Sequence, residues 1–331
     1  MQREFIRNIA ILLGINLLIK PVYIFGIDRT MQNHAGTENW GWYATLLSFC
    51  YLFQMVNDFG IQNFNSRHIS QNRQLLKKHF PRFLFIKTLF AILFLGIAHL
   101  LGVVFDYAPG WLFLVVAVNL VITSFVLFLR SNIAGLGFYR TDSLLSALDK
   151  FLMIVIVGTI FLVPAWKATL TILDFALIQT ISLSVTLVIA LSVLVPYVQF
   201  RGFTMKKAFA WMILRQMAPF ALVTFLMTLY TRLDVVMIEK LLPDGKFEAG
   251  IYAAGFRLLD AANNVGFLMA GLLLPMFSRM LKTRENVNPT ILTAVRIILP
   301  VAVAATGLLV FFGEEVMLLL HRPNATPYWG S

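Results

Sequence analysis

Two cations of this chain lie deep inside apolar stretches, where a charge is costly. Lys20 lies about twelve residues into the first apolar run, so a helix would carry it about 18 Å into a hydrocarbon layer about 30 Å thick. Arg232 lies about ten residues before Pro243, at a similar depth in a later run. A cation there costs about 3 kcal/mol or more unless water or an anion accompanies it. The pair therefore predicts a cationic pocket, which suits a phosphate-bearing substrate.

Other polar residues recur at helical spacing within apolar runs. Asp260 and Asn264 lie three and seven residues after Arg257, which places all three on one helix face. Polar groups inside membrane spans usually face the bundle interior or a water-filled cavity. We therefore predict one substrate-binding cavity from the following residues: Lys20, Arg232, Arg257, Asp260, Asn264, Asn16, Asp58 and Asn119.

Structural roles stay open for several polar positions. Asp58 also suits a hydrogen-bonding hub near the inner interface, and Arg257 and Asp260 are spaced to neutralise each other within one helix. Arg130 ends a long apolar run, which favours a side chain that reaches the cytoplasmic interface. Threonines near Arg232 more often bond the backbone one turn back, and this run contains Thr224, Thr228 and Thr231.

Sequence motifs of enzymes and metal sites are absent. The chain has no GxxxxGK[ST], HExxH or GxSxG pattern, and its five histidines show no ligand spacing. A single cysteine, Cys50, excludes a disulfide framework and a cysteine-rich metal site. We therefore expect no catalytic residue, no metal and no cofactor, and we expect that the protein is not an enzyme.

The elements that must position these residues are membrane-spanning helices. The 331 residues are 59% hydrophobic and 13% charged, whereas soluble domains carry about 25% charged residues. This composition predicts an all-α polytopic membrane protein, because a soluble core of this size could not bury so many apolar side chains. Nine apolar runs of spanning length occur, at about 8–27, 41–62, 83–105, 111–130, 147–164, 169–195, 213–242, 249–277 and 290–312. The first leaves Asp28 and Arg29 near the outer interface.

Charge asymmetry predicts the orientation. Most of the 27 Lys and Arg residues fall in segments that share the side of the N-terminus, and this group includes Lys87, Arg130 and Lys150. The opposite loops carry acidic residues, so the positive-inside rule places the N-terminus in the cytoplasm. The net charge of +11 therefore reflects topology rather than nucleic-acid binding, and no nucleic-acid partner is expected.

A short internal repeat predicts two lobes. Residues 41–44 (GWYA) resemble residues 250–253 (GIYA), and each motif is followed by a similar helix end, at 64–67 (FNSR) and 277–279 (FSR). Six spans separate the copies, which preserves orientation and indicates a parallel repeat. We expect an N-terminal six-helix lobe at 1–205 and an incomplete C-terminal lobe at 206–331, with three spans and the start of a fourth. The second lobe thus suggests a fragment, with a natural nine-span protein as the alternative.

These motifs resemble a known family. Lys20, residues 41–43 (GWY), 58–61 (DFGI) and 67–70 (RHIS), together with 230–234 (YTRLD), 250–254 (GIYAA) and 257–260 (RLLD), are similar to polysaccharide-biosynthesis flippases of the Wzx type. Those belong to the multidrug/oligosaccharidyl-lipid/polysaccharide (MOP) exporter superfamily. The resemblance covers essentially the whole chain.

The resemblance implies a MATE-like bundle of two six-helix lobes around a central cavity. Such proteins carry undecaprenyl-pyrophosphate-linked oligosaccharides across the bacterial inner membrane by alternating access, and they supply O-antigen, capsule or exopolysaccharide assembly. Cavity cations such as Lys20 and Arg232 would engage the pyrophosphate. Further expected partners are the lipid bilayer, the glycan polymerase and export machinery, and a coupling H⁺ or Na⁺. The alternatives are a cation-coupled multidrug exporter of the same superfamily and, less in keeping with the sequence, a membrane-embedded polymerase or acyltransferase.

Overall fold

A computed structural model describes residues 14–16, 18–62, 73–107, 110–199, 207–256, 259 and 287–320. All the regular structure in these ranges is helical. Five helices are long and apolar enough to cross a membrane, namely Phe80–Val104, Trp111–Gly135, Tyr139–Leu162, Ile172–Tyr197 and Trp211–Leu241. They coincide with five of the nine predicted spans. The predicted class is therefore confirmed: the protein is an all-α polytopic membrane protein.

The start of the chain continues as helix beyond the predicted first span. After Pro21 follow a π-helix, η1 (Val22–Asp28), and α2 (Arg29–Ala35). Helix then resumes beyond Gly36 as α3 (Thr37–Leu52), and α4 (Gln54–Asp58) follows directly. Gly36 has φ 83°, a conformation that strongly favours glycine and that separates α2 from α3. Asp28, just beyond the predicted first span, is 3% exposed.

The middle of the chain forms long helices joined by short connections. These are α6 (Arg73–Val104), α7 (Trp111–Gly135), α8 (Tyr139–Leu162), the short α9 (Pro164–Thr169) and α10 (Ile172–Leu194), with a 3₁₀ turn, η2 (Val195–Tyr197), at the end. A capping box starts α10: the Thr171 hydroxyl accepts a hydrogen bond from the Asp174 backbone N–H at 3.2 Å, and the Asp174 carboxylate accepts one from the Thr171 backbone N–H at 2.9 Å.

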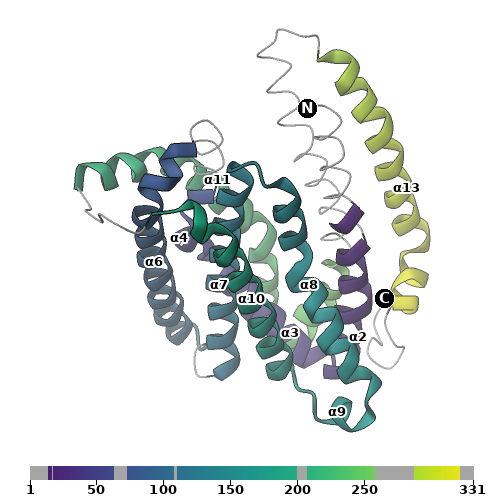
Figure 1. Ribbon diagram of the computed structural model, residues 1–331. Helices are drawn as coiled ribbons and strands as arrows, with labels where there is room; N and C mark the ends of the chain where they lie inside the picture. Colours follow the sequence, from purple (N-terminus) through teal and green to yellow (C-terminus); the bar gives the residue numbers. More distant parts are fainter. Residues whose placement is uncertain are drawn as a thin grey trace.

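The last described helices belong to the second predicted lobe. They are α11 (Lys207–Leu241), a helical segment at 245–256 and α13 (Asn288–Leu320). The segment at 245–256 holds the beginning of the predicted eighth span, whose remainder lies outside the described residues apart from residue 259. In Figure 1, α13 runs along the edge of the bundle.

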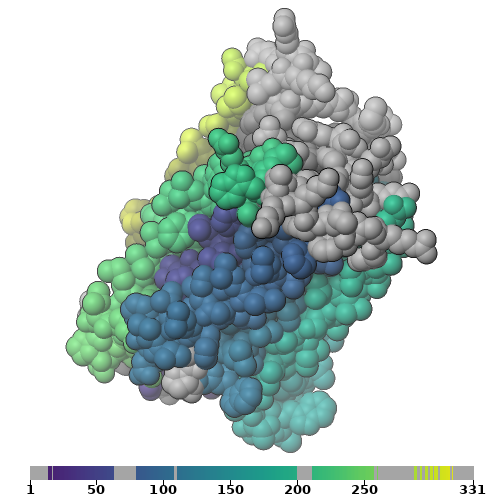
Figure 2. Space-filling model, turned by 90° about the vertical axis from the view of Figure 1, so that its left-hand side faces the viewer, coloured from purple at the N-terminus to yellow at the C-terminus, as the bar shows by residue number. Residues whose placement is uncertain are grey.

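The packing of these helices brings distant parts of the sequence together. α7 packs against α10 most extensively, and α11 packs along α3 and α4 (Figure 1). In Figure 2, purple residues from the beginning of the chain are visible between α11 (green) and α6 (blue). Large apolar side chains such as Ile181, Val188, Leu222 and Val223 remain exposed on α10 and α11. Their exposure is consistent with a surface that lipid covers.

Candidate functional site

A cavity of about 810 Å³ lies where α3, α7, α8, α10 and α11 meet the helix of Lys20 and η1. Its lining combines several tyrosines and threonines with six charged side chains, some positive and some negative. Four are cations and two are carboxylates, a formal excess of two positive charges, and they are Lys20, Arg130, Lys150, Arg232, Asp28 and Asp149. The cavity therefore offers a net positive surface inside an apolar bundle.

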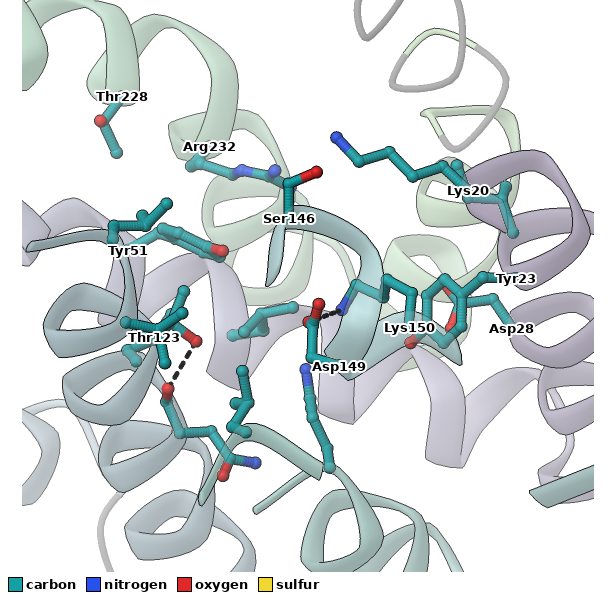
Figure 3. A pocket seen from close by; sticks show the side chains of 18 of the residues that line it. Lys20, Tyr23, Asp28, Tyr51, Thr123, Ser146, Asp149, Lys150, Thr228 and Arg232 are labelled. Carbon is teal, nitrogen blue, oxygen red and sulfur yellow. Dashed lines mark hydrogen bonds and ion pairs between the residues drawn. The ribbon is translucent and has the colours of Figure 1, made fainter. Parts of the chain in front are cut away.

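Lys20 and Arg232 come from helices more than 200 residues apart, and they point toward one another across this cavity (Figure 3). The Arg232 guanidinium stacks over the Tyr51 ring at 4.9 Å and the Phe256 ring at 5.5 Å from the ring centroids. Aromatic faces stabilise a cation. Among the described residues, no carboxylate lies within ion-pair distance of Lys20. The structure thus brings together the two residues on which the predicted pocket depends.

A second charged group lines the same cavity on α8 (Figure 3). The Lys150 ammonium lies 3.2 Å from the Asp149 carboxylate and 4.6 Å from the centroid of the Tyr23 ring, and the carboxylate of Asp28 also acts on it. The helix α8 begins at Tyr139, earlier than the predicted start near 147, so Lys150 lies about three turns inside it.

Arg130 belongs to the cavity as well. Its Nε donates a hydrogen bond to the Asp142 carboxylate at 2.8 Å, so α7 and the first turn of α8 are joined by an ion pair. α7 continues to Gly135, five residues beyond Arg130, where the predicted span ends.

Asn119 joins α7 to α10 at the cavity wall. Its amide nitrogen donates to the carbonyl oxygen of Ala176 at 2.9 Å, and its amide oxygen accepts from the Thr180 hydroxyl at 2.7 Å. One turn beyond Ala176 along α10, Gln179 accepts a hydrogen bond from the Tyr43 hydroxyl at 3.1 Å. Asn119 therefore lines the cavity, as predicted, and its amide also holds two walls in place.

Asn16 reaches the cavity through another side chain. Its amide donates to the Ser146 hydroxyl at 2.7 Å, and Ser146 lines the cavity. The Asn16 side chain therefore links the first helix to α8, close to Asp149 and Lys150.

Asp58 lies in a different place, on α4 where it packs against α6. Its carboxylate is 3.6 Å from the ammonium of Lys87, a side chain with 0% exposure. Lys87 also donates to the Asn57 carbonyl at 2.7 Å and to the Ser124 hydroxyl. Lys87 lies in the helix Phe80–Val104, which matches the predicted span at 83–105. Asp58 does not line the cavity of Lys20 and Arg232; its contacts are those of the alternative, a structural hub.

The cavity threonines of α11 bond their own helix. Thr224, Thr228 and Thr231 donate to the carbonyl oxygens one turn back, at Phe220, Thr224 and Met227, over 2.9, 2.8 and 3.0 Å. This confirms that the three hydroxyl groups bond the backbone one turn back, although all three residues line the cavity. The other predicted site residues, Arg257, Asp260 and Asn264, lie outside the described residues.

Most residues that line the cavity were not among the predicted site, and three examples are Lys150, Tyr51 and Gln179. Lys150 has a usable signal in the sequence, because Asp149 and Lys150 are followed directly by an apolar run from Phe151. Gln179 has one as well, since it is a single polar residue within the apolar run at 169–195 and such residues usually face the bundle interior. Tyr51 has none. Within the described residues, no group of three His, Cys, Asp or Glu could hold a metal ion.

A protein-family model described as "Polysaccharide biosynthesis protein" matches residues 5–281. The chain belongs to this family. It is the family of the Wzx-type flippases of the MOP exporter superfamily, as the sequence motifs predicted. No curated protein and no solved structure matches the chain significantly. Family and fold together make this a multi-pass membrane protein of polysaccharide synthesis or export.

Proposed function

We propose that the protein is a flippase that moves an undecaprenyl-pyrophosphate-linked oligosaccharide from the cytoplasmic to the periplasmic leaflet of a bacterial inner membrane. The unit would serve O-antigen, capsule or exopolysaccharide assembly. The observation that carries the proposal is the convergence of Lys20 and Arg232 on one cavity with an excess of cations. A pyrophosphate needs several donors at once, and ammonium and guanidinium groups supply them as charge-assisted hydrogen bonds.

The walls of the cavity suit the rest of such a substrate. Hydroxyl and amide groups of Tyr43, Tyr51, Gln179 and Ser146 lie beside the cations, and they match the hydrogen-bonding character of sugar rings. Apolar exposed helices around the bundle suit a polyprenyl tail that stays in lipid while the head group enters the cavity. Transport by alternating access then requires the cavity to open toward each leaflet in turn.

The remaining parts of the proposal concern topology and partners. The N-terminus lies in the cytoplasm, residues 1–205 form one lobe, and residues 206–331 contribute to a second lobe. The glycan polymerase and export machinery would receive the product, and an H⁺ or Na⁺ gradient would drive the cycle. The protein acts as a transporter without a catalytic residue.

Complementation tests the assignment. The protein is expressed in a strain that lacks its own flippase for a compatible glycan, and surface glycan is measured beside the accumulation of the lipid-linked precursor. We expect Lys20→Met and Arg232→Gln each to reduce surface glycan strongly and to raise the precursor, because each removes a donor to the pyrophosphate. Lys167→Met is the matched control, since Lys167 is exposed on α9 and lies outside the cavity lining.

Two results would overturn the proposal. Normal surface glycan from the Lys20→Met/Arg232→Gln double variant, with correct insertion, would exclude the cationic cavity as the substrate site. Failure of the unaltered protein to export any glycan, together with gradient-dependent efflux of a cationic drug, would favour the exporter alternative. The excess of cations over carboxylates argues against that alternative, because a cationic drug would meet net repulsion.

A further inference from the structure

The two glycines of the internal repeat meet at one end of the bundle. A Cβ atom built on Gly41 would lie 1.9 Å from the carbonyl oxygen of Lys246 and 2.6 Å from the backbone nitrogen of Gly250. A Cβ atom built on Gly250 would lie 2.2 Å from the carbonyl oxygen of Thr37. Helix backbones approach this closely only where the residues are glycine. The start of α3 and the segment at 245–256 therefore cross in direct backbone contact.

The contact is reciprocal in the register of the repeat. Gly41 corresponds to Gly250 when the GWYA and GIYA motifs are aligned, an offset of 209 residues, and the same offset relates Thr37 to Lys246. Gly41 thus faces the equivalent of Thr37, while Gly250 faces Thr37 itself. Gly41 contacts Lys246, and their counterparts in the other copy, Gly250 and Thr37, contact each other in the same way. Such a reciprocal contact is characteristic of a two-fold relation. The crossing therefore lies on the axis that relates the two copies of the motif.

Aromatic and charged side chains surround this crossing. The Lys246 ammonium lies 4.4 Å from the Trp42 ring centroid, and the Lys240 ammonium lies 4.5 Å from that of Tyr107. The Tyr107 hydroxyl donates to the Glu239 carboxylate at 2.5 Å. Burial, and then the hydrogen bond to Glu239, raise the pKa of Tyr107, so its proton stays in place to make this bond. These contacts join the first lobe to the end of α11 and the segment that follows it.

The crossing stands directly beyond the cavity. Tyr43, two residues along α3 from Gly41, lines the cavity, and Arg232 lines it from α11 two turns before Glu239. Trp40, next to Gly41, and Met31 of α2 are both 0% exposed, and they share one packed core with Tyr43. Tight packing therefore extends from the crossing to the cavity lining where α2 gives way to α3.

We propose that the Gly41–Gly250 crossing is the closed gate of the cavity at this end. The assignment rests on the proposed transport cycle, which requires one end to open while the other is shut. Two backbone surfaces without side chains can part and meet again with no interlocking side chain to repack, which suits a contact that forms once in every cycle. With the N-terminus in the cytoplasm, this is the periplasmic gate.

The first test is to replace the glycines. Gly41→Ala and Gly250→Ala prevent the crossing, since the added methyl groups meet backbone atoms that cannot move aside. Gly96→Ala in α6 and Gly158→Ala in α8 are the matched controls, because a Cβ atom at either position meets nothing within 4 Å. The readout is labelling of Thr228→Cys, a cavity position, by a membrane-impermeant maleimide added on the α2–α3 side of sealed vesicles. Cys50 is fully buried, so little background is expected from it.

We expect the Gly41→Ala and Gly250→Ala variants to be labelled about tenfold faster than the parent, as when a minor open state becomes the main one. The controls should be labelled at the parent rate. Equal labelling rates in all five proteins would overturn the proposal. The assay uses no substrate, so this result is independent of whether the cargo is a lipid-linked glycan.

A locking experiment covers the case in which the alanine variants do not fold. Trp42→Cys and Lys246→Cys place two thiols across the gate, and a short bifunctional maleimide joins them in the folded protein. Joined protein should keep Thr228→Cys unlabelled from this side. Export is measured in the Trp42→Cys/Lys246→Cys protein with Thr228 unchanged: joined protein should lose glycan export, whereas the same protein without the cross-linker should retain it. Continued export by fully joined protein would overturn the gate. If cross-linking blocks labelling but the parent protein exports no glycan, the gate is supported and the proposed lipid-linked glycan substrate is refuted.

Discussion

Lys20 and Lys87 carry the same charge within apolar helices of one lobe, yet their surroundings differ in every respect. Lys87 is 0% exposed and is held by the Asp58 carboxylate, the Asn57 carbonyl and the Ser124 hydroxyl. Lys20 lines a cavity, opposite Arg232, and no described carboxylate lies within ion-pair distance of it. An ammonium has three N–H donors, and only those of Lys87 all have protein partners.

This difference separates a structural cation from a binding cation. A charge saturated by protein oxygens has little left to offer a ligand, and removing it exposes its partners. A charge that faces a cavity needs water or an anion to offset its desolvation. Depth in the membrane is therefore not the quantity that marks a substrate site; the number of unsatisfied donors is.

The largest expected effect comes from Lys87. Lys87→Met leaves the Asp58 carboxylate buried without its cation, so the free energy of unfolding should fall by about 3 kcal/mol or more. Thermal unfolding in detergent measures the loss, with Lys167→Met as the control on the exposed α9. Lys87→Met with Asp58→Asn should recover most of the stability, because no unpaired charge remains. If Lys87→Met has the same melting temperature as the parent, Lys87 is not a structural cation and does not differ from Lys20 in this respect.

The second expected effect is on binding rather than stability. Lys20→Met should leave the melting temperature close to that of the parent, since no described partner loses its charge, and the change in stability should stay within about 0.5 kcal/mol. Affinity for a short-chain polyprenyl diphosphate should fall about tenfold, as expected for one hydrogen bond to a charged group. Ligand titration of the melting temperature measures both quantities in one series. Unchanged affinity together with a large drop in stability would show that Lys20, like Lys87, is a structural cation.

The pairing of charges marks the limit of what sequence could predict. The convergence of Lys20 and Arg232 was predictable because each is isolated in an apolar run, and an isolated deep charge restricts its possible environments. The partner of Asp58 was not predictable, because Lys87 lies 29 residues away and follows basic residues at 77–82, with which it was grouped as part of a cytoplasmic segment. The five long helices followed from apolar run length alone.

Helix starts were harder to predict than helix interiors. The first turns of α8 contain Arg140, Thr141 and Asp142, so the apolar run begins well after the helix does. This delay placed the predicted start of the span near residue 147, whereas α8 begins at Tyr139. After residue 27, the polar residues at 28–39 predicted the end of the first span, yet the chain stays helical through η1 and α2 to Ala35.

Arg130 provides an intermediate case. It lines the cavity as Lys20 does, yet it pairs with Asp142 at 2.8 Å, and the two side chains are 19% and 20% exposed. A double-mutant cycle with Arg130→Gln and Asp142→Asn should give a coupling free energy of about 1 kcal/mol in thermal unfolding, because partial solvation screens the pair. Coupling near zero would group Arg130 with Lys20, and coupling above about 3 kcal/mol would group it with Lys87.

The smallest effect is expected at a cavity residue that carries no charge. Thr228 lines the cavity beside Arg232, but its hydroxyl proton is donated to the Thr224 carbonyl at 2.8 Å. A hydroxyl has one donor, and a pyrophosphate requires donors, so this side chain has none to give. Thr228→Val keeps the shape of the side chain, and it should change the affinity for polyprenyl diphosphate by less than about twofold, within the scatter expected of a surface-like substitution. Titration beside Lys20→Met in the same detergent makes the comparison direct. A tenfold loss in Thr228→Val would show that the hydroxyl turns toward the ligand on binding, and satisfied donors in the unliganded protein would then no longer distinguish structural from binding residues.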